Sequence, residues 1–266
     1  MKFSCVYPLY YGSKISEVKA SFKSILNQTL KANEILIVFD GPVSIEISNF
    51  IKKFKKKNIR IIKFKKNLGL GKILRKVIKL AKYEIIVRAD ADDINKKKRF
   101  QYLINYFEKN SSIHVVSSHV KEIHKNKKLI KKLPLNHSDI IKIKNFKNPI
   151  NHPAVAFKKK AVLKCGGYEN LPFFEDYFLW LKMIDKNYKF HNLDKTLVIS
   201  KIEDDFYTRR SGIKYLRHYL FFLNKIKSKK YINIVEYIIN FLLRTLIYIL
   251  PKMFITSFYK YLNNRK

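Results

Sequence analysis

The sequence predicts an α/β fold, a doubly wound parallel sheet with helices packed against it, from two observations. Through the first half of the 266-residue chain, apolar runs of strand length alternate with segments that have the period of a helix. These runs are apolar almost throughout, which is typical of strands buried on both faces. Because each strand is followed by a helix, neighbouring strands are expected to be parallel and joined by helical crossovers.

The first half contains four expected strands, separated by three expected helices. The expected strands are residues 3–9, 34–40, 59–64 and 84–90. The expected helices are residues 16–28, a helix that Ser44 would cap, and a helix that begins in the turn 67–71 and ends near Ala81. A further helix runs through Phe100 and Leu103, and Asp92 or Asp93 is a candidate for its cap.

The pattern changes after about residue 111. Residues 113–123 and 127–133 are expected to pair as a hairpin or meander, and residues 148–157 then form a loop. A helix is expected over 175–185 and a pair of strands within 190–199, and from residue 213 onward the chain is expected to be helical.

The charge of the chain limits its possible partners. Lys and Arg number 56 against 20 Asp and Glu, a formal net charge of +36 at pH 7, while 47% hydrophobic residues exclude a disordered polycation. Such a charge favours nucleic acid or an anionic membrane as a partner, unless the lysines only solvate the surface. Cys5 and Cys165 have no paired spacing, which excludes a zinc ribbon or a disulfide framework. The apolar start is too short for a signal peptide, so a cytoplasmic location is expected.

Residues 232–250 form an apolar segment close in length to the ~20 residues of a transmembrane helix. Its polar residues recur at spacings of three, four and four, so they share one stripe of a helix; they are Asn233, Glu236, Asn240 and Arg244. With three lysines just before it, such a helix suits a membrane interface. Packing on the domain or on another subunit is the alternative, and a true span is disfavoured because a central Glu and Arg are costly in lipid.

Asp90, Asp92 and Asp93 lie within four residues, directly after the apolar run 85–87. One of them is explained if it caps a helix, but two remain. An Asp-x-Asp pair at the end of a buried strand suits a hard divalent cation such as Mg²⁺ or Mn²⁺, which would offset the charge of a diphosphate leaving group. Residues 8–11 and 40–41 also follow strands, and open α/β sheets bind ligands beyond the carboxyl ends of their strands.

Five segments, in order, resemble those of the family 2 glycosyltransferases, in particular the enzymes that assemble bacterial exopolysaccharide and lipopolysaccharide. The segments are SILNQTLKANEILIVFDGP (24–42), NLGLGKIL (67–74), RADADD (88–93), INHPAVAFKKKAVLKCGGY (150–168) and FEDYFLWLKM (174–183). The resemblance covers roughly residues 3–212. It implies the GT-A fold of nucleotide-diphospho-sugar transferases, a Rossmann-like mixed sheet flanked by helices, here with a C-terminal helical extension.

The resemblance also implies a donor site. The residues that it places around the donor nucleotide are Pro8, Tyr10, Asp40, Asn67, Gly69, Arg88 and Asp90. Within this set Asp40 would accept a hydrogen bond from the base, although the family often has two aspartates where this chain has Phe39 and Asp40. The alternative for Asp40 is a turn residue before Gly41. Asp92 would bind the metal ion that bridges the diphosphate.

The remaining predicted site residues lie in the second half of the chain. Asp176 would be the general base that takes the proton of the acceptor hydroxyl, with Glu175 and His152 at the acceptor site. The alternative for Glu175 and Asp176 is that they only complement a helix dipole. The resemblance also places Arg209 and Arg210 at the donor diphosphate, and guanidinium groups suit phosphate oxygens; a solvated basic pair is the alternative.

The sequence therefore predicts a metal-dependent, inverting hexosyltransferase. It would move a sugar from a nucleotide-diphosphate sugar, in particular a UDP-sugar, to a lipid-linked or oligosaccharide acceptor in cell-surface polysaccharide biosynthesis. The expected place is the cytoplasmic face of the bacterial inner membrane, without nucleic acid as a partner. Residues 1–212 would form the transferase domain, with a nucleotide-binding half (1–110) and an acceptor-binding half (111–212), and residues 213–266 a basic amphipathic region. The alternatives are a basic nucleic-acid- or membrane-binding protein, in which the aspartates are caps, and a sugar nucleotidyltransferase.

Overall fold

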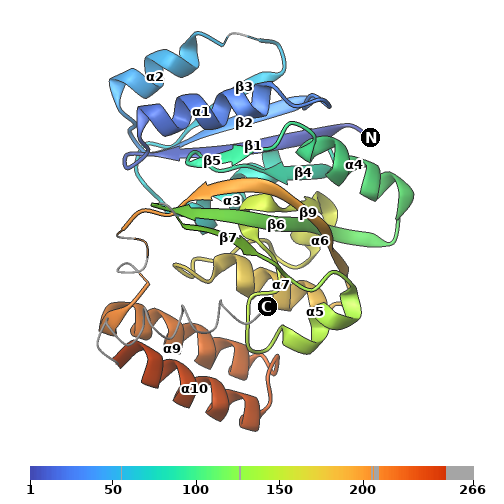
Figure 1. The fold of residues 1–266 in the computed structure, drawn as a ribbon, viewed down its shortest axis with the longest axis vertical. Coiled ribbons are helices and arrows are strands. Elements are labelled where there is room, and N and C mark those ends of the chain that lie inside the picture. Colours follow the sequence, from blue (N-terminus) through green and yellow to red (C-terminus); the bar gives the residue numbers. More distant parts are fainter. Residues whose placement is uncertain (55, 126, 205, 207–209, 250–266) are drawn as a thin grey trace. The chain divides into compact units, whose positions relative to one another are not determined.

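The computed structural model describes residues 1–249 except 55, 126, 205 and 207–209. The chain divides into two compact units, Met1–Ile202 and a second that begins at Glu203 (Figure 1). The division into domains at residue 212 stays a prediction.

The first unit is built on a nine-stranded mixed sheet, in the order β3-β2-β1-β4-β8-β6-β9-β5, with β7 paired to β6. The strands are β1 (Phe3–Tyr10), β2 (Glu34–Asp40), β3 (Ile59–Lys63), β4 (Ile85–Arg88), β5 (Asp93–Asn95), β6 (Ile113–His124), β7 (Lys127–Lys131), β8 (Ala156–Lys158) and β9 (Lys189–Lys201). The first four strands are mutually parallel, as predicted. Antiparallel β8 joins this parallel half to β6, which makes the sheet mixed.

Helices cover both faces of this sheet (Figure 1). They are α1 (Ile15–Leu26), α2 (Ile45–Lys52), α3 (Leu70–Leu80), α4 (Arg99–Lys109), α5 (His137–Ile143), the 3₁₀ turn η1 (His152–Ala154), α6 (Lys159–Lys164) and α7 (Glu175–Asp185). Successive side chains of β1 enter opposite clusters, because strand side chains alternate between faces. Cys5 and Tyr7 pack with residues of α1 and α4, and Val6 packs with residues of α3 and α7. Cys5 is a buried free thiol in the core.

The turn after β2 requires a glycine. Gly41 has a φ of +84°, and a Cβ at this position would lie 2.6 Å from the backbone nitrogen of Asn67. Its absence lets the segment 66–67 approach the end of β2 closely. Ser44 then caps α2 as predicted, since its side chain accepts a hydrogen bond from the Ile47 N–H at 3.2 Å.

Two expectations are wrong. Asp92 and Asp93 do not cap the next helix: α4 begins at Arg99 with Lys98 at its N-cap, and Asp93 is the first residue of β5. The strand pair expected within 190–199 is one continuous strand, β9. Its register against β6 shifts between Ser118 and Val120. Such irregularities interrupt the alternation of side chains, so that one long strand has the pattern of two short ones.

The second unit contains the helices α9 (Gly212–Ser228) and α10 (Ile234–Ile249), so the helical expectation for this region is confirmed as far as residue 249. Within the described residues, no helix has both the length and the apolar character needed to cross a membrane.

Candidate active site

A cleft of about 430 Å³ lies at the carboxyl ends of β1, β2 and β4. Every residue predicted for the donor nucleotide or the metal lines it: Pro8, Tyr10, Asp40, Asn67, Gly69, Arg88, Asp90 and Asp92. These residues come from four separate stretches of the sequence. The fold brings them together because the parallel strands all end at the same edge of the sheet.

Asp40 holds the turn that leads into α3. Its carboxylate oxygens accept hydrogen bonds from the backbone N–H of Leu68 at 2.7 Å and of Gly69 at 3.0 Å, and only 4% of the residue is exposed. Asp40 therefore precedes the turn at Gly41, as the alternative interpretation expected, and its side chain also stabilises the separate turn at residues 67–69. Because an ionised carboxylate has about four acceptor positions, these two bonds leave capacity for a hydrogen bond from a base.

The three aspartates after β4 form a group suited to a divalent cation. One side-chain oxygen from each of Asp90, Asp92 and Asp93 lies within 4.8 Å of the others. Asp90 also pairs with the guanidinium of Arg88 at 2.6 Å. Burial, followed by the charges of Asp90 and Asp92, raises the pKa of Asp93 well above its usual value. Oδ1 of Asp93 is buried and has no hydrogen-bond partner within the described residues, so a cation would relieve both the repulsion and this unsatisfied atom.

Arg99, which the sequence analysis did not single out, lies beneath this loop. Its guanidinium is fully buried; Nη2 donates to the carbonyl of Arg88 at 2.6 Å and Nη1 donates to the side chain of Asn95. These bonds tie the residues on either side of the aspartates to the start of α4. Burial lowers the pKa of Arg99 to about 10. The sequence did offer a signal for this buried arginine: Arg99 directly precedes Phe100, on the face of the helix that is buried.

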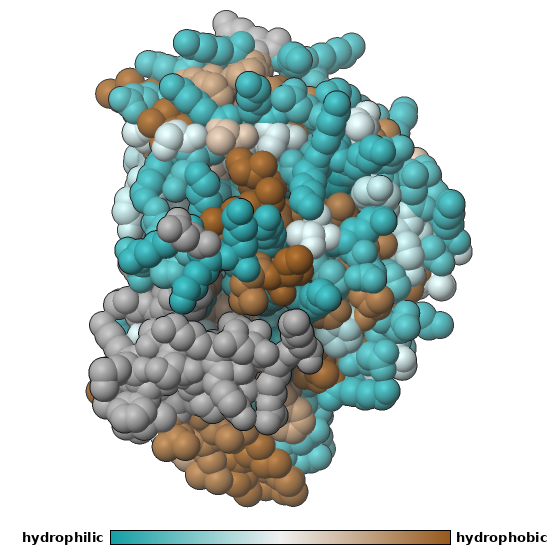
Figure 2. Space-filling model, viewed as in Figure 1, coloured by the Kyte–Doolittle hydropathy of each residue, from teal (hydrophilic) through white to brown (hydrophobic). Residues whose placement is uncertain are grey.

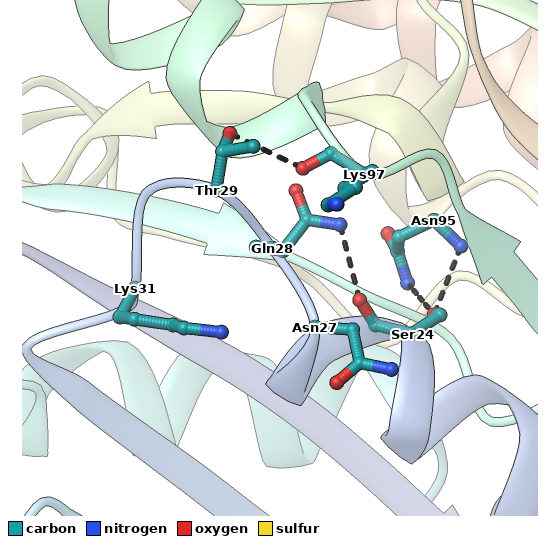
Figure 3. Close-up of a pocket in the computed structure, with 7 residues that line it drawn as sticks. All are labelled: Ser24, Asn27, Gln28, Thr29, Lys31, Asn95 and Lys97. Carbon is teal, nitrogen blue, oxygen red and sulfur yellow. Dashed lines mark hydrogen bonds between the residues drawn. The ribbon is translucent and has the colours of Figure 1, made fainter.

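A second hollow, of about 560 Å³, contains none of the predicted site residues (Figure 3). Gln28 crosses it: its amide donates to the carbonyls of Ser24 and Lys96, and its oxygen accepts from the N–H of Phe100. The Ser24 hydroxyl accepts from the backbone and the side chain of Asn95. These polar groups bond to one another, and their hydrogen bonds join the end of α1 to the segment before α4.

The predicted base lies in the first turn of α7. Asp176 is 7% exposed, and its Oδ2 accepts a hydrogen bond from the Asn148 amide at 2.8 Å. Nδ1 of His152 is 3.9 Å from the same oxygen, and Nε2 of His152 bonds to the hydroxyl of Tyr168 at 2.8 Å. Asn148 and Tyr168 are therefore part of this constellation, although the sequence analysis assigned neither of them a role.

Burial determines the protonation of Asp176 and His152. It raises the pKa of Asp176, against the lowering effect of the Asn148 hydrogen bond. A raised pKa makes a carboxylate a stronger base. Burial, together with the charge of Arg88, lowers the pKa of His152 well below its usual value, so its imidazole is neutral. Asp176 thus faces a neutral ring and an amide donor, an arrangement that can accept a proton from a hydroxyl group.

The starts of α3 and α7 adjoin, which brings the predicted base toward the donor cleft. A Cβ added to Gly71 would lie 2.4 Å from the carbonyl oxygen of Glu169 and 3.2 Å from Cβ of Glu175.

Arg209 lies outside the described residues. Arg210 is exposed and belongs to the second unit, where its guanidinium lies 3.7 Å from the ring centre of Phe206. The diphosphate role of this pair stays a prediction.

A mixed sheet with an acidic cluster and a ligand-sized cleft at its strand ends is the arrangement of a nucleotide-sugar transferase of the GT-A type. The family model "Glycosyl transferase family 2" matches residues 4–167, and the chain belongs to this family. The UDP-Gal:alpha-D-GlcNAc-diphosphoundecaprenol beta-1,3-galactosyltransferase of Escherichia coli is 34% identical, over 97% of this chain and 95% of its own. The amylovoran biosynthesis glycosyltransferase AmsE of Erwinia amylovora is 30% identical, over 94% of each chain.

Solved structures show the same fold. Staphylococcus aureus TarS in complex with UDP-GlcNAc has a TM-score of 0.65 at 16% identity, over 85% of this chain and 66% of that one. A Pyrobaculum calidifontis mannosyltransferase in complex with GDP-Man and Mn²⁺ has a TM-score of 0.64 at 12% identity, over 85% and 64%. This chain therefore spans about two thirds of each neighbour. The comparisons confirm the predicted family, the fold and a glycosyltransferase activity.

Proposed function

We propose that this glycosyltransferase uses a UDP-sugar, depends on a divalent cation, and transfers the sugar to a hydroxyl group of a lipid-linked saccharide with inversion at the anomeric carbon. The observation that carries the proposal is the single cleft lined by all the residues predicted for the nucleotide and the metal. The name of the E. coli relative supports a UDP-sugar donor and a lipid diphosphate acceptor, and that of the E. amylovora relative supports a role in polysaccharide biosynthesis. We place the reaction at the cytoplasmic face of the bacterial inner membrane.

In the donor site, Pro8 and Tyr10 would contact the base, and Asp40 would both hold the turn 67–69 and accept from the base. Asp90, fixed by its ion pair with Arg88, would face the ribose. Arg209 and Arg210 would bind the diphosphate.

The aspartate cluster would hold the cation through Asp92, with Asp93 beside it. When bound, a divalent cation offsets the negative charge that the diphosphate gains as it leaves. The carboxylates fit this role by their spacing, since like charges within 4.8 Å favour a cation between them. A neighbour of the same fold contains Mn²⁺, which supports the same type of ion here.

On the acceptor side, Asp176 would take the proton of the attacking hydroxyl group, with Glu175 and His152 beside the acceptor. The hydrogen bond from Asn148 fixes the orientation of the carboxylate, and the neutral ring of His152 adds no positive charge that would weaken it as a base. The hydroxyl oxygen attacks the anomeric carbon from the side opposite the diphosphate, so the configuration inverts without a covalent intermediate on the enzyme.

Thermal unfolding against nucleotides tests the donor site. The wild type and Asp92→Ala are compared with UDP, UDP-galactose, UDP-N-acetylglucosamine and GDP, with and without Mn²⁺. A ligand at 100 times its Kd stabilises the fold by ~2.7 kcal/mol, and we expect this for uridine nucleotides only when Mn²⁺ and Asp92 are present. Asp139→Ala removes an exposed carboxylate outside the cleft and should keep the full shift. A shift that is indifferent to Asp92, or affinity for RNA instead of nucleotides, contradicts the proposal.

Asp176→Asn separates chemistry from donor binding. Without a base, turnover should fall by at least ~100-fold, the lower end of what general base catalysis contributes, while the Mn²⁺-dependent shift with uridine nucleotides is retained. Turnover near the wild-type value in Asp176→Asn would show that another group takes the proton.

A further inference from the structure

The polarity of α10 is the reverse of that of a helix on a water-soluble protein, which turns its apolar face inward. The polar stripe of α10 instead faces inward. Asn240 is 4% exposed, and Glu236 and Arg244 are half-buried. The sequence analysis identified this stripe but not the direction in which it points.

Polar contacts with α9 fix the orientation of α10. The hydroxyl of Tyr219 donates to Oδ1 of Asn240 at 3.2 Å, and the hydroxyl of Tyr237 donates to Oδ1 of Asn224 at 2.7 Å. The guanidinium of Arg244 lies 5.8 Å from the ring centre of Tyr219. Turning the apolar face of α10 inward would break these contacts, so the two helices form a hairpin with a polar seam.

The outward side of α10 is apolar from Ile234 to Leu246. Large side chains that are 37–61% exposed cover it: Ile234, Val235, Ile238, Ile239, Phe241, Leu242, Leu243 and Leu246. Figure 2 shows this surface as the brown area over α10, at the lower end of the view. Contiguous apolar surface of this extent on a protein marks a binding face, because water disfavours it.

We propose that this outward face of α10 inserts into the interfacial layer of an anionic membrane. Charge supports this occupant: residues 212–249 contain seven Lys and Arg and one acidic residue. Lys229 and Lys230, both exposed, lie in the turn that precedes the apolar face. Apolar side chains flanked by lysines are the pattern of helices that lie in the plane of a bilayer with acidic lipids. A second copy of the chain is disfavoured as the occupant, since +36 charges would meet +36.

Flotation with lipid vesicles tests this face, and because it needs no substrate its result is independent of the proposed function. The full chain is mixed with vesicles of phosphatidylcholine, with or without phosphatidylglycerol. We expect the wild type to float with the vesicles that contain phosphatidylglycerol and to dissociate as salt is added. The double variant Ile238→Glu, Leu242→Glu, at the centre of the face, should lose at least ~100-fold in affinity for the vesicles. In this variant, charges replace two apolar side chains that the bilayer would bury. Lys229→Glu with Lys230→Glu should reduce binding to acidic vesicles.

The matched control is Ile45→Glu with Ile130→Glu, which replaces two exposed isoleucines of the first unit and should bind as the wild type does. Circular dichroism confirms that each variant is folded. Equal flotation of the α10 variant and this control overturns the proposal. It also fails if the wild type does not float. Sedimentation velocity then tests a second copy of the chain as the occupant: a dimer that Ile238→Glu, Leu242→Glu dissociates would show it.

Discussion

Replacing Gly71 with alanine should separate the two halves of the active site. The added methyl group would lie 2.4 Å from the carbonyl oxygen of Glu169 and 3.2 Å from Cβ of Glu175. The first of these obstacles is a backbone atom, so no change of rotamer relieves the contact. The segment 169–175 must move away from α3, and it carries the candidate base Asp176 with it.

The expected size of the effect follows from this geometry. Overpacking of a well-packed interior costs typically ~1–3 kcal/mol, and a fixed backbone obstacle puts Gly71→Ala at about 2–3 kcal/mol. For a chain of this size that lowers Tm by roughly 4–12 °C. A displacement of the base by about 1 Å reduces turnover by ~100-fold. Urea unfolding gives the first quantity, and single-sugar transfer at a temperature well below Tm gives the second.

Gly166→Ala is the matched control. Gly166 has a φ of +78°, but a Cβ there meets nothing within 4 Å, so the variant suffers backbone strain of about 1–2 kcal/mol without displacing a neighbour. It should lose stability and keep its turnover. If Gly71→Ala is as active as Gly166→Ala, the two helix starts are not coupled as the contact indicates, and the reasoning fails.

Three further predictions concern buried polar groups. Asn148→Ala removes the hydrogen bond that orients the carboxylate of Asp176 and lowers its pKa. Because the carboxylate is then no longer held in place, turnover should fall about tenfold. Burial already raises this pKa, so wild-type turnover should decline with falling pH at a higher pH than an ordinary Asp would give. In the variant this decline moves to a still higher pH, as a pH–kcat profile would show. Arg99→Gln leaves the carbonyl of Arg88 without its charged donor and should cost about 3 kcal/mol in urea unfolding. Asp93 has a raised pKa in the folded state, so its contribution to stability is present at low pH and is lost as the pH rises through that value. Asp93→Asn should flatten this dependence of Tm on pH, and an unchanged slope would contradict it.

The parallel half of the sheet could be predicted from the sequence because the information is local. The bounds of β2 are those expected, and the Ser44 cap is where the pattern placed it. Buried parallel strands are continuous apolar runs, and the residues after each run necessarily share one edge of the sheet. That rule brought Pro8, Asp40 and Asp90 into one cleft before any contact was known.

The second half of the site could not be predicted in this way, because its contacts join segments with no common pattern. Asn148 and Asp176 are 28 residues apart and belong to a loop and a helix. Arg99 bonds to a carbonyl eleven residues before it. Asp93 is a strand residue instead of a helix cap because it pairs with Ser200 of β9, far along the chain. The direction in which the polar stripe of α10 points depends on contacts with α9. The periodicity of α10 alone carries no information about those contacts.

Arg88 connects the donor and acceptor chemistry through charge. Burial raises the pKa of both Asp90 and Asp176, and the guanidinium of Arg88 opposes burial at each of them. The same charge lowers the pKa of His152 further. One cation thus favours an ionised Asp90, an ionised Asp176 and a neutral His152, the combination that the proposed proton removal from an acceptor hydroxyl requires. Replacing Arg88 with a neutral residue would therefore change both sides of the reaction, whereas Asn148→Ala changes only the base.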